Sequence, residues 1–223
     1  HRDAQRFAEV WANQEGKVYG KVNTKVITDE EASVQNILDG MDWLVKETTQ
    51  RDVAVVFISA HGLRDARNNY YLATREIDPQ SLRSTGVRFS EVKELLRDLP
   101  CKVILFVDTC HSGGITGGKA VGWDDPLRDL VSEEYGAVVF SSCLPREISL
   151  EDPRWQHGAF TKALLDTFGS SDSDNNGDGY LSLTELEEHV YQKVKQLTQG
   201  QQHPVVERPS TIRNFSFFFV GSG

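Results

Sequence analysis

V-A-V-V-F-I-S, residues 53–59, and V-I-L-F-V, residues 103–107, are continuous apolar runs rich in β-branched side chains. Runs of this length and composition indicate strands that are buried on both faces. A third run of the same kind spans Ala137–Phe140. A helical pattern lies between the first two runs, and strand, helix, strand predicts a parallel pair. The sequence therefore predicts an α/β sheet covered by helices on both faces.

Apolar residues at helical spacing predict the layers around this sheet. The expected helices are an opening helix that contains Phe7 and Trp11, a second that begins at a capping box of Thr28 and Glu31, a third capped by Ser90 and ended by Pro100, and two later helices near Phe160–Phe168 and Leu186–Leu197. Two further segments, Lys17–Ile27 and Asn214–Val220, have strand character. We expect all 223 residues to form a single domain.

The composition limits the classes of partner. Hydrophobic residues make up 39% and charged residues 26%, as in an ordinary soluble globule. No apolar run approaches the roughly 20 residues of a membrane helix, so no membrane partner is expected. A net charge of −9 without a Lys or Arg cluster argues against nucleic acid and favours basic peptides or metal ions. Three cysteines are too few for a secreted disulfide scaffold, so we expect a reducing, cytoplasmic compartment.

Two reactive side chains follow the two central runs. His61 stands in A-H-G after the first, and Cys110 stands in D-T-C-H-S-G after the second. If the strands are parallel neighbours about 5 Å apart, both residues emerge at the same sheet edge. An imidazole there can take the thiol proton or protonate the leaving amine. Cys110 is therefore predicted as the nucleophile and His61 as its acid/base partner, with the amides of Gly62 and Cys110 as an oxyanion hole. The alternative is that both are ordinary buried residues, which their joint placement disfavours.

Four short sequence motifs resemble those of a known family: S-A-H-G (59–62), D-T-C-H-S-G (108–113), S-S-C (141–143) and H-G-A-F-T (157–161). With them the sequence resembles the caspase-like peptidases, and within these the metacaspases and bacterial orthocaspases rather than the animal caspases. His61 precedes Cys110 by 49 positions, close to the roughly 50 of caspases. The resemblance implies a caspase-like, mostly parallel sheet flanked by helices and a cysteine endopeptidase activity.

Two departures from the family pattern matter. Animal caspases carry Gln two residues before the nucleophile and Arg after it, where this chain has Asp108 and His111. The metacaspase resemblance therefore implies an acidic S1 pocket, with Asp108 and Asp3 as its walls, that binds Arg or Lys at P1. The family also begins with a central strand ahead of its first helix, and this sequence starts too late to contain it. We expect a removed N-terminal segment or a partner chain to supply that strand.

A calcium-loop signature occupies Asp174–Glu185, which reads D-N-N-G-D-G-Y-L-S-L-T-E. Gly179 falls at position 6, where an EF-hand loop turns sharply. Helical patterns precede and follow the loop, as an EF-hand requires. The expected ligands are Asp174, Asn176, Asp178, the carbonyl of Tyr180, Ser182 and Glu185. The alternative is an acidic turn that binds no metal, and for a bound ion both a structural and a regulatory role stay open.

Ser112–Ser132 is the longest stretch of low hydrophobicity, and we expect it to be a mobile surface loop. Lys119 and Arg128 make it a candidate processing loop for an enzyme that cleaves after basic residues. The sequence thus predicts a self-processing cysteine endopeptidase that acts on proteins or peptides with exposed Arg or Lys, with Ca²⁺ and no organic cofactor. Two alternatives stay open: a catalytically silent calcium-binding module that retains the fold, and an acyl transferase that passes the thioester to an amine.

Overall fold

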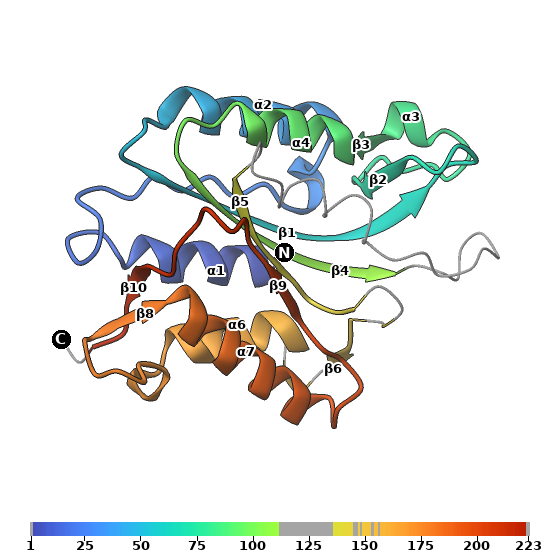
Figure 1. Cartoon of the computed structure of the whole chain (residues 1–223). Helices are drawn as coiled ribbons and strands as arrows, with labels where there is room; N and C mark the ends of the chain where they lie inside the picture. Colours follow the sequence, from blue (N-terminus) through green and yellow to red (C-terminus); the bar gives the residue numbers. More distant parts are fainter. Residues whose placement is uncertain are drawn as a thin grey trace.

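The structure, a computed structural model, describes residues 2–111, 136–144, 147, 149–152, 154–155 and 157–221, and for residues 110, 111 and 151 it describes the backbone. Its centre is a six-stranded sheet with the strand order β3-β2-β1-β4-β5-β9 (Figure 1). The strands are β1 Val53–Arg64, β2 Tyr70–Ala73, β3 Gly86–Arg88, β4 Lys102–His111, β5 Ala137–Ser141 and β9 Val205–Glu207. β1, β4 and β5 pair in parallel, whereas β2 and β9 run antiparallel to their neighbours β1 and β5.

Helices cover both faces of this sheet (Figure 1). α2 (Val34–Glu47) and α4 (Phe89–Arg97) lie on one side, and α1 (Arg2–Ala12), α6 (Ala159–Phe168) and α7 (Leu183–Leu197) lie on the other. Alternate residues of β4 serve the two layers, since Ile104 and Phe106 pack with Phe7 of α1 while Leu105 packs with Val92 of α4. The predicted α/β fold with helices on both faces is confirmed.

The remaining elements are short. They are the helical turns η1 (Asp29–Glu31), α3 (Leu82–Thr85) and η3 (Ser171–Ser173), the antiparallel pair β6 (Glu151–Asp152) and β7 (His157–Gly158), and the antiparallel pair β8 (Tyr180–Ser182) and β10 (Ser216–Phe219). The strand predicted at Asn214–Val220 therefore exists as β10, but it pairs with β8 outside the central sheet. The predicted loop Ser112–Ser132 lies outside the described residues.

β1 has an edge that carries no second neighbour. It pairs with β4 over Val53–Gly62, but with β2 only over Gly62–Arg64. Within the described part of the chain, no strand pairs with residues 53–61 on the side away from β4. We call this side the open edge of β1.

The open edge corrects one expectation. In β4, Val103–Val107 are at most 2% exposed, as predicted for a strand buried on both faces. In β1, Val53 and the four residues 55–58 are only partly buried. The prediction of full burial is therefore wrong for β1, because a strand without a neighbour on one side leaves part of its side chains uncovered.

The strand predicted over Lys17–Ile27 is also wrong. Within this segment only Tyr19 takes part in a bridge, an isolated one to Glu15, and residues 21–28 form no regular element. The segment packs beside α2 instead, because Lys25 lies over the Trp43 ring. β-branched residues favour a strand only where a partner strand is present to pair with them.

Two predicted helix starts are displaced. Thr28 makes no capping bond, and α2 begins after Ser33, whose hydroxyl accepts a hydrogen bond from the Asn36 amide at 3.2 Å. The intervening η1 turn begins with Asp29 at φ 50°, outside the helical region, so a helix cannot continue from Thr28. α4 begins at Phe89, so Ser90 lies within the helix rather than at its cap.

Candidate active site

The ends of β1 and β4 bring the two predicted catalytic residues side by side along the backbone. In the parallel register, His61 lies opposite Cys110, and Gly62 lies opposite His111. Neighbouring strands are about 5 Å apart, so these residues are nearest cross-strand neighbours. Both strands continue through these residues, beyond the apolar runs that ended at Ser59 and Val107 in the sequence. His61 is exposed, as a residue that meets a substrate must be. The structure thus places the predicted pair at one edge of the sheet, and the catalytic roles stay predictions.

Asp108 is a buried carboxylate held by two hydroxyl groups. Its side chain is among the least exposed of the acidic groups, with 7% of the residue accessible. Ser149 donates to Oδ1 at 2.8 Å, and Thr161 of α6 donates to Oδ2 at 2.6 Å. A Cβ placed on Gly158 would lie 2.9 Å from Oδ2, closer than such atoms normally approach. Asp108 therefore has a fixed orientation, and any side chain at position 158 would crowd its carboxylate.

Asp3, at the start of α1, lies beside the same glycine. Its Oδ1 is 2.5 Å from Nδ1 of His157, and its Oδ2 accepts a long hydrogen bond of 3.5 Å from the Gly158 amide. The Asp3 and His157 side chains are 18% and 17% exposed. The two acids predicted to line one pocket, Asp3 and Asp108, therefore both lie beside Gly158. Asp3 already has an imidazole partner, so a basic ligand would share it with His157.

Three residues of this cluster carried no role in the sequence analysis. Ser149 and Thr161 hold Asp108, and His157 pairs with Asp3. Two of them belong to the motif H-G-A-F-T at 157–161, which had been noted only as a family landmark. That motif was the sequence signal that could have identified His157 and Thr161 as site residues. Ser149 belongs to no such motif, and only the three-dimensional contacts identify it.

Gly62 lies under the phenol end of Tyr70. A Cβ on Gly62 would lie 1.3 Å from the Tyr70 hydroxyl oxygen, so no side chain fits at this position. Burial raises the pKa of Tyr70, and a hydrogen bond with the Thr109 side chain opposes that rise without cancelling it. Tyr70 is therefore a neutral phenol at physiological pH.

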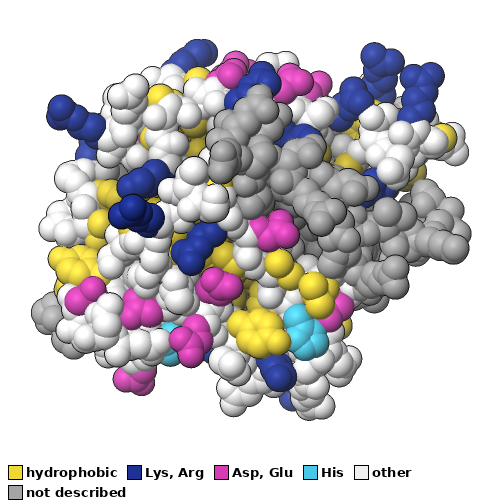
Figure 2. All heavy atoms as spheres, viewed as in Figure 1, with side chains coloured by type: hydrophobic (Ala, Val, Ile, Leu, Met, Phe, Trp, Pro, Cys, Tyr) yellow, Lys and Arg dark blue, Asp and Glu magenta, His cyan; other side chains and the backbone are white. Residues whose placement is uncertain are grey.

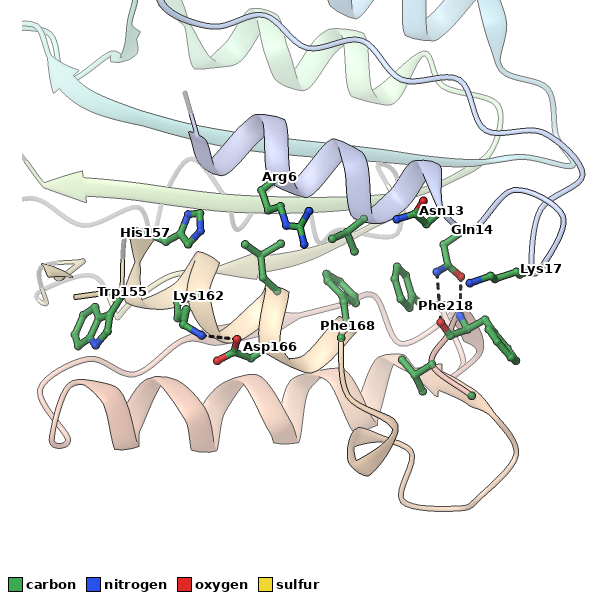
Figure 3. A pocket seen from close by; sticks show the side chains of 16 residues that line it. Arg6, Asn13, Gln14, Lys17, Trp155, His157, Lys162, Asp166, Phe168 and Phe218 are labelled. Carbon is green, nitrogen blue, oxygen red and sulfur yellow. Dashed lines mark hydrogen bonds and ion pairs between the residues drawn. The ribbon is translucent and has the colours of Figure 1, made fainter. Parts of the chain in front are cut away.

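A groove of about 510 Å³ runs between α1, α6 and the C-terminal residues 218–221. Figure 3 shows His157 at the end where α6 begins and Lys17 at the opposite end. Lys162 pairs with Asp166 at 2.5 Å, Arg6 pairs with Glu9 at 2.8 Å, and Lys17 lies over the Phe219 ring. Neither His61 nor the Asp108 carboxylate lines the groove. Among the described residues of the candidate active site, His157 is the one that lines the groove.

The loop predicted to bind calcium folds around Asp174. Asp174 accepts hydrogen bonds from the amides of Gly177 at 2.8 Å and Gly179 at 2.7 Å. Desolvation raises the pKa of Asp174, but the backbone hydrogen bonds together outweigh it and lower the pKa below its usual value. Gly179 has φ +84°, the left-handed conformation expected at the sharp turn. Asn176 accepts from the Asp178 amide at 2.9 Å, which extends the same turn.

The end of this loop begins α7. Ser182 and Glu185 form a capping box, with the Ser182 amide 2.9 Å from the Glu185 carboxylate. On the other side the predicted helix exists as α6, which ends at Phe168, and the turn Ser171–Ser173 joins it to the loop. Among the residues that the structure describes, no group of three or more His, Cys, Asp and Glu side chains is arranged to hold a metal ion. Calcium binding stays a prediction.

The fold and the pairing of His61 with Cys110 define a class: an α/β protein with the framework of a cysteine peptidase. A sequence model of the caspase domain family matches residues 1–216. The chain therefore belongs to the caspase domain family of cysteine peptidases. No curated protein matches the chain in sequence.

A solved structure supports the fold. The crystal structure of protein GSU0716 from Geobacter sulfurreducens superposes with a TM-score of 0.64 at 16% identity, over 95% of this chain and 84% of that one. At this level of identity the likeness concerns the fold alone. In the described part of the chain, no helix combines the length and apolarity that a membrane crossing requires.

Proposed function

We propose that this protein is a cysteine endopeptidase that cleaves after Arg or Lys. The observation that carries the proposal is the parallel register that sets His61 opposite Cys110 at the ends of β1 and β4. Alternate residues of a strand share a face, and positions 61 and 110 share the parity of Phe57 and Phe106, which belong to one core cluster. We therefore expect the imidazole and the sulfur to meet on the α1 and α6 side of the sheet.

The proposed reaction uses that pair in two stages. The Cys110 sulfur attacks the carbonyl carbon while His61 takes the thiol proton, and the amides of Gly62 and Cys110 stabilise the oxyanion. The C–N bond then breaks as His61 gives the proton to the leaving amine. Water, deprotonated by His61, hydrolyses the thioester and frees the thiol. No cofactor takes part in these bond changes.

The acidic cluster supports the choice of a basic P1 side chain. Asp3 and Asp108 lie on either side of Gly158, and a guanidinium or ammonium group there would meet negative charge from both. Fluorogenic peptides that differ only at P1 test this specificity. Cleavage after Arg and Lys but not after Asp supports the proposal, and a preference for Asp contradicts it.

We also propose that residues 174–185 bind Ca²⁺ and that the ion regulates or stabilises the enzyme. The sequence pattern and the left-handed turn at Gly179 support it. Figure 2 shows acidic side chains over the lower left of the view, where β8 and α7 lie in Figure 1. Such a surface favours a cation.

Replacing Asp174 by Asn is expected to remove calcium binding. The change deletes a ligand charge but keeps one side-chain oxygen for the loop amides, so the loop can still fold. Titration calorimetry with CaCl₂ should show binding to the wild type and at least about tenfold weaker binding to the variant. Asp172→Asn, an exposed residue just before the loop, makes the same charge change as a control. Equal affinity in all three proteins, or binding to none, contradicts the proposal.

We further propose that a β-strand from outside the described residues pairs with the open edge of β1. α1 begins beside Gly158, at the end of the sheet where β4 reaches Asp108, and it packs along β1 through the stacked rings of Phe7 and Phe57. A parallel strand that leads into a helix ends at the helix start, so a strand just ahead of α1 fits this slot. An added strand would cover the partly exposed apolar residues of β1.

Hydrogen exchange is expected to reveal the open edge. Amides of residues 53–61 that point away from β4 should exchange at least about a hundredfold faster than amides of residues 103–107, because no described strand pairs with them on that side. Mass spectrometry of peptides that span the two strands provides the comparison, with β4 as the internal control. Equally slow exchange in both strands would show that the edge is already covered in this chain, and would contradict the open edge of β1.

A further inference from the structure

Tyr70 spans the strand that carries His61. It is the first residue of β2, which pairs with β1 so that Leu72 faces Gly62 and Tyr70 faces Arg64. The Tyr70 ring turns back along this pair, and a Cβ on Gly62 would lie 1.3 Å from its hydroxyl oxygen and 2.1 Å from Cζ. The phenol end therefore occupies the space that a side chain at position 62 would fill.

The hydroxyl group reaches the next strand. It shares a hydrogen bond with the side chain of Thr109, which precedes Cys110 in β4 and is 1% exposed. Because the strand order is β2-β1-β4, this contact crosses β1 at the level of its predicted catalytic residues. Phe89 packs edge-on against the Tyr70 ring at 6.1 Å, and the Arg64 guanidinium lies 5.6 Å from its centroid. One buried side chain thus links three strands where β1 and β4 reach the site.

We propose that Tyr70 is a positioning residue, which fixes the distance between the β1 and β4 ends and thereby the alignment of His61 with Cys110. This inference rests on the proposed function of that pair. Strand ends fray more easily than strand centres, and proton transfer between two side chains depends steeply on their alignment. A phenol bonded to Thr109 limits the movement of both ends without touching the substrate.

The substitution Tyr70→Phe tests the role, because it deletes the hydroxyl group and keeps the ring. With an Arg-P1 peptide, kcat should fall about 5- to 10-fold, the rate equivalent of one net hydrogen bond, while KM changes less than about twofold. Alkylation of Cys110 by iodoacetamide at neutral pH should slow by a similar factor, with its pH midpoint moved upward, since a misaligned imidazole assists the thiol less.

Tyr71→Phe is the matched control. Tyr71 is the next residue of β2, is 2% exposed, and its hydroxyl lies 3.4 Å from Asp65, away from the site. The melting temperature of Tyr71→Phe should fall to a similar extent as that of Tyr70→Phe, but its kcat and its alkylation profile should stay those of the wild type. Equal loss of kcat in the two variants would show that Tyr70 has only a structural role, and unchanged kcat and alkylation in Tyr70→Phe would also overturn the proposal.

A double-mutant cycle with Thr109→Val tests the specific contact. If the hydrogen bond acts as proposed, the alkylation rate of Tyr70→Phe/Thr109→Val should match that of the worse single variant. If the fold-losses in alkylation rate of the two single variants multiply in the double variant, the two substitutions act independently, which would contradict the inference. The alkylation assay needs no peptide cleavage. If the wild type cleaves no peptide but the Tyr70 dependence of alkylation persists, the proposed function fails and the positioning role stands.

Discussion

A Cys110→Ala variant is expected to lose peptidase activity almost completely. Removal of the nucleophile from an enzyme that forms a covalent intermediate lowers kcat by about 10⁴- to 10⁶-fold, since only binding and oxyanion stabilisation remain. The measurement is kcat/KM with an Arg-P1 fluorogenic peptide. His61→Ala should give a loss of similar order, because the two residues act as a unit.

Cys101 provides the matched control. It stands just ahead of β4, at the opposite end of the strand from Cys110, and is partly buried. Burial raises the pKa of the Cys101 thiol, and Cys143 is 4% exposed. Both should therefore react slowly with an active-site electrophile, so that labelling of the wild type is found at Cys110. Cys101→Ala should keep full activity.

The Cys110→Ala variant also separates the proposed function from its alternatives. The wild-type chain should be cut after Lys119 or Arg128 during storage, whereas Cys110→Ala should stay intact, as judged by intact-mass spectrometry. Failure of Cys110 to take up the electrophile would favour a catalytically silent module. Aminolysis products that dominate in the presence of an added amine would favour an acyl transferase.

Asp108→Asn is expected to have the second largest effect. The carboxylate is buried between Ser149 and Thr161, and the amide can keep hydrogen bonds to both hydroxyl groups, which can donate or accept. The fold should therefore survive while the negative charge is lost. Removing one partner of a desolvated charge pair typically costs about 2–5 kcal/mol, so kcat/KM for Arg-P1 peptides should fall by about two to three orders of magnitude.

A control for the charge change comes from the opposite face of the sheet. Asp39 of α2 is exposed and accepts a hydrogen bond from Gln35 at 2.8 Å. Asp39→Asn should leave kcat/KM unchanged. Thermal melting of both variants distinguishes lost recognition from unfolding. Retention of full activity toward Arg-P1 peptides by Asp108→Asn would remove this carboxylate from the specificity pocket.

The strands β1, β4 and β5 of the central sheet could be predicted from the sequence because their determinants are local. The runs at 53–59 and 103–107 are strongly apolar, and the helix between them forces a parallel crossover. Once the strands are parallel neighbours, His61 and Cys110 at their ends must share an edge, and the observed register agrees. The cap at Thr28 failed for an equally local reason, since Asp29 adopts a positive φ that no capping pattern reports.

The site formed by Asp3 and Asp108 could be predicted only in part. Asp108 and Asp3 entered through the family resemblance, but their common neighbour Gly158 and the hydroxyl of Ser149 did not. These contacts join residues about 40 to 155 positions apart. No periodicity within a helix or strand records such a distance, so the orientation of the carboxylates needed the folded chain.

Taken by itself, the sequence determined the order of the strands β1, β4 and β5 and of the longer helices, the parallel pairing of β1 with β4, and the positions of His61 and Cys110 at the strand ends. Tertiary structure alone decided that Tyr70 crosses Gly62 to reach Thr109, that both acids meet at Gly158, and that β1 keeps an open edge. The physical reason is the separation along the chain over which each kind of interaction acts. Hydrophobic periodicity acts over one turn or one strand, whereas hydrogen bonds and burial depend on which distant segments the completed fold brings into contact.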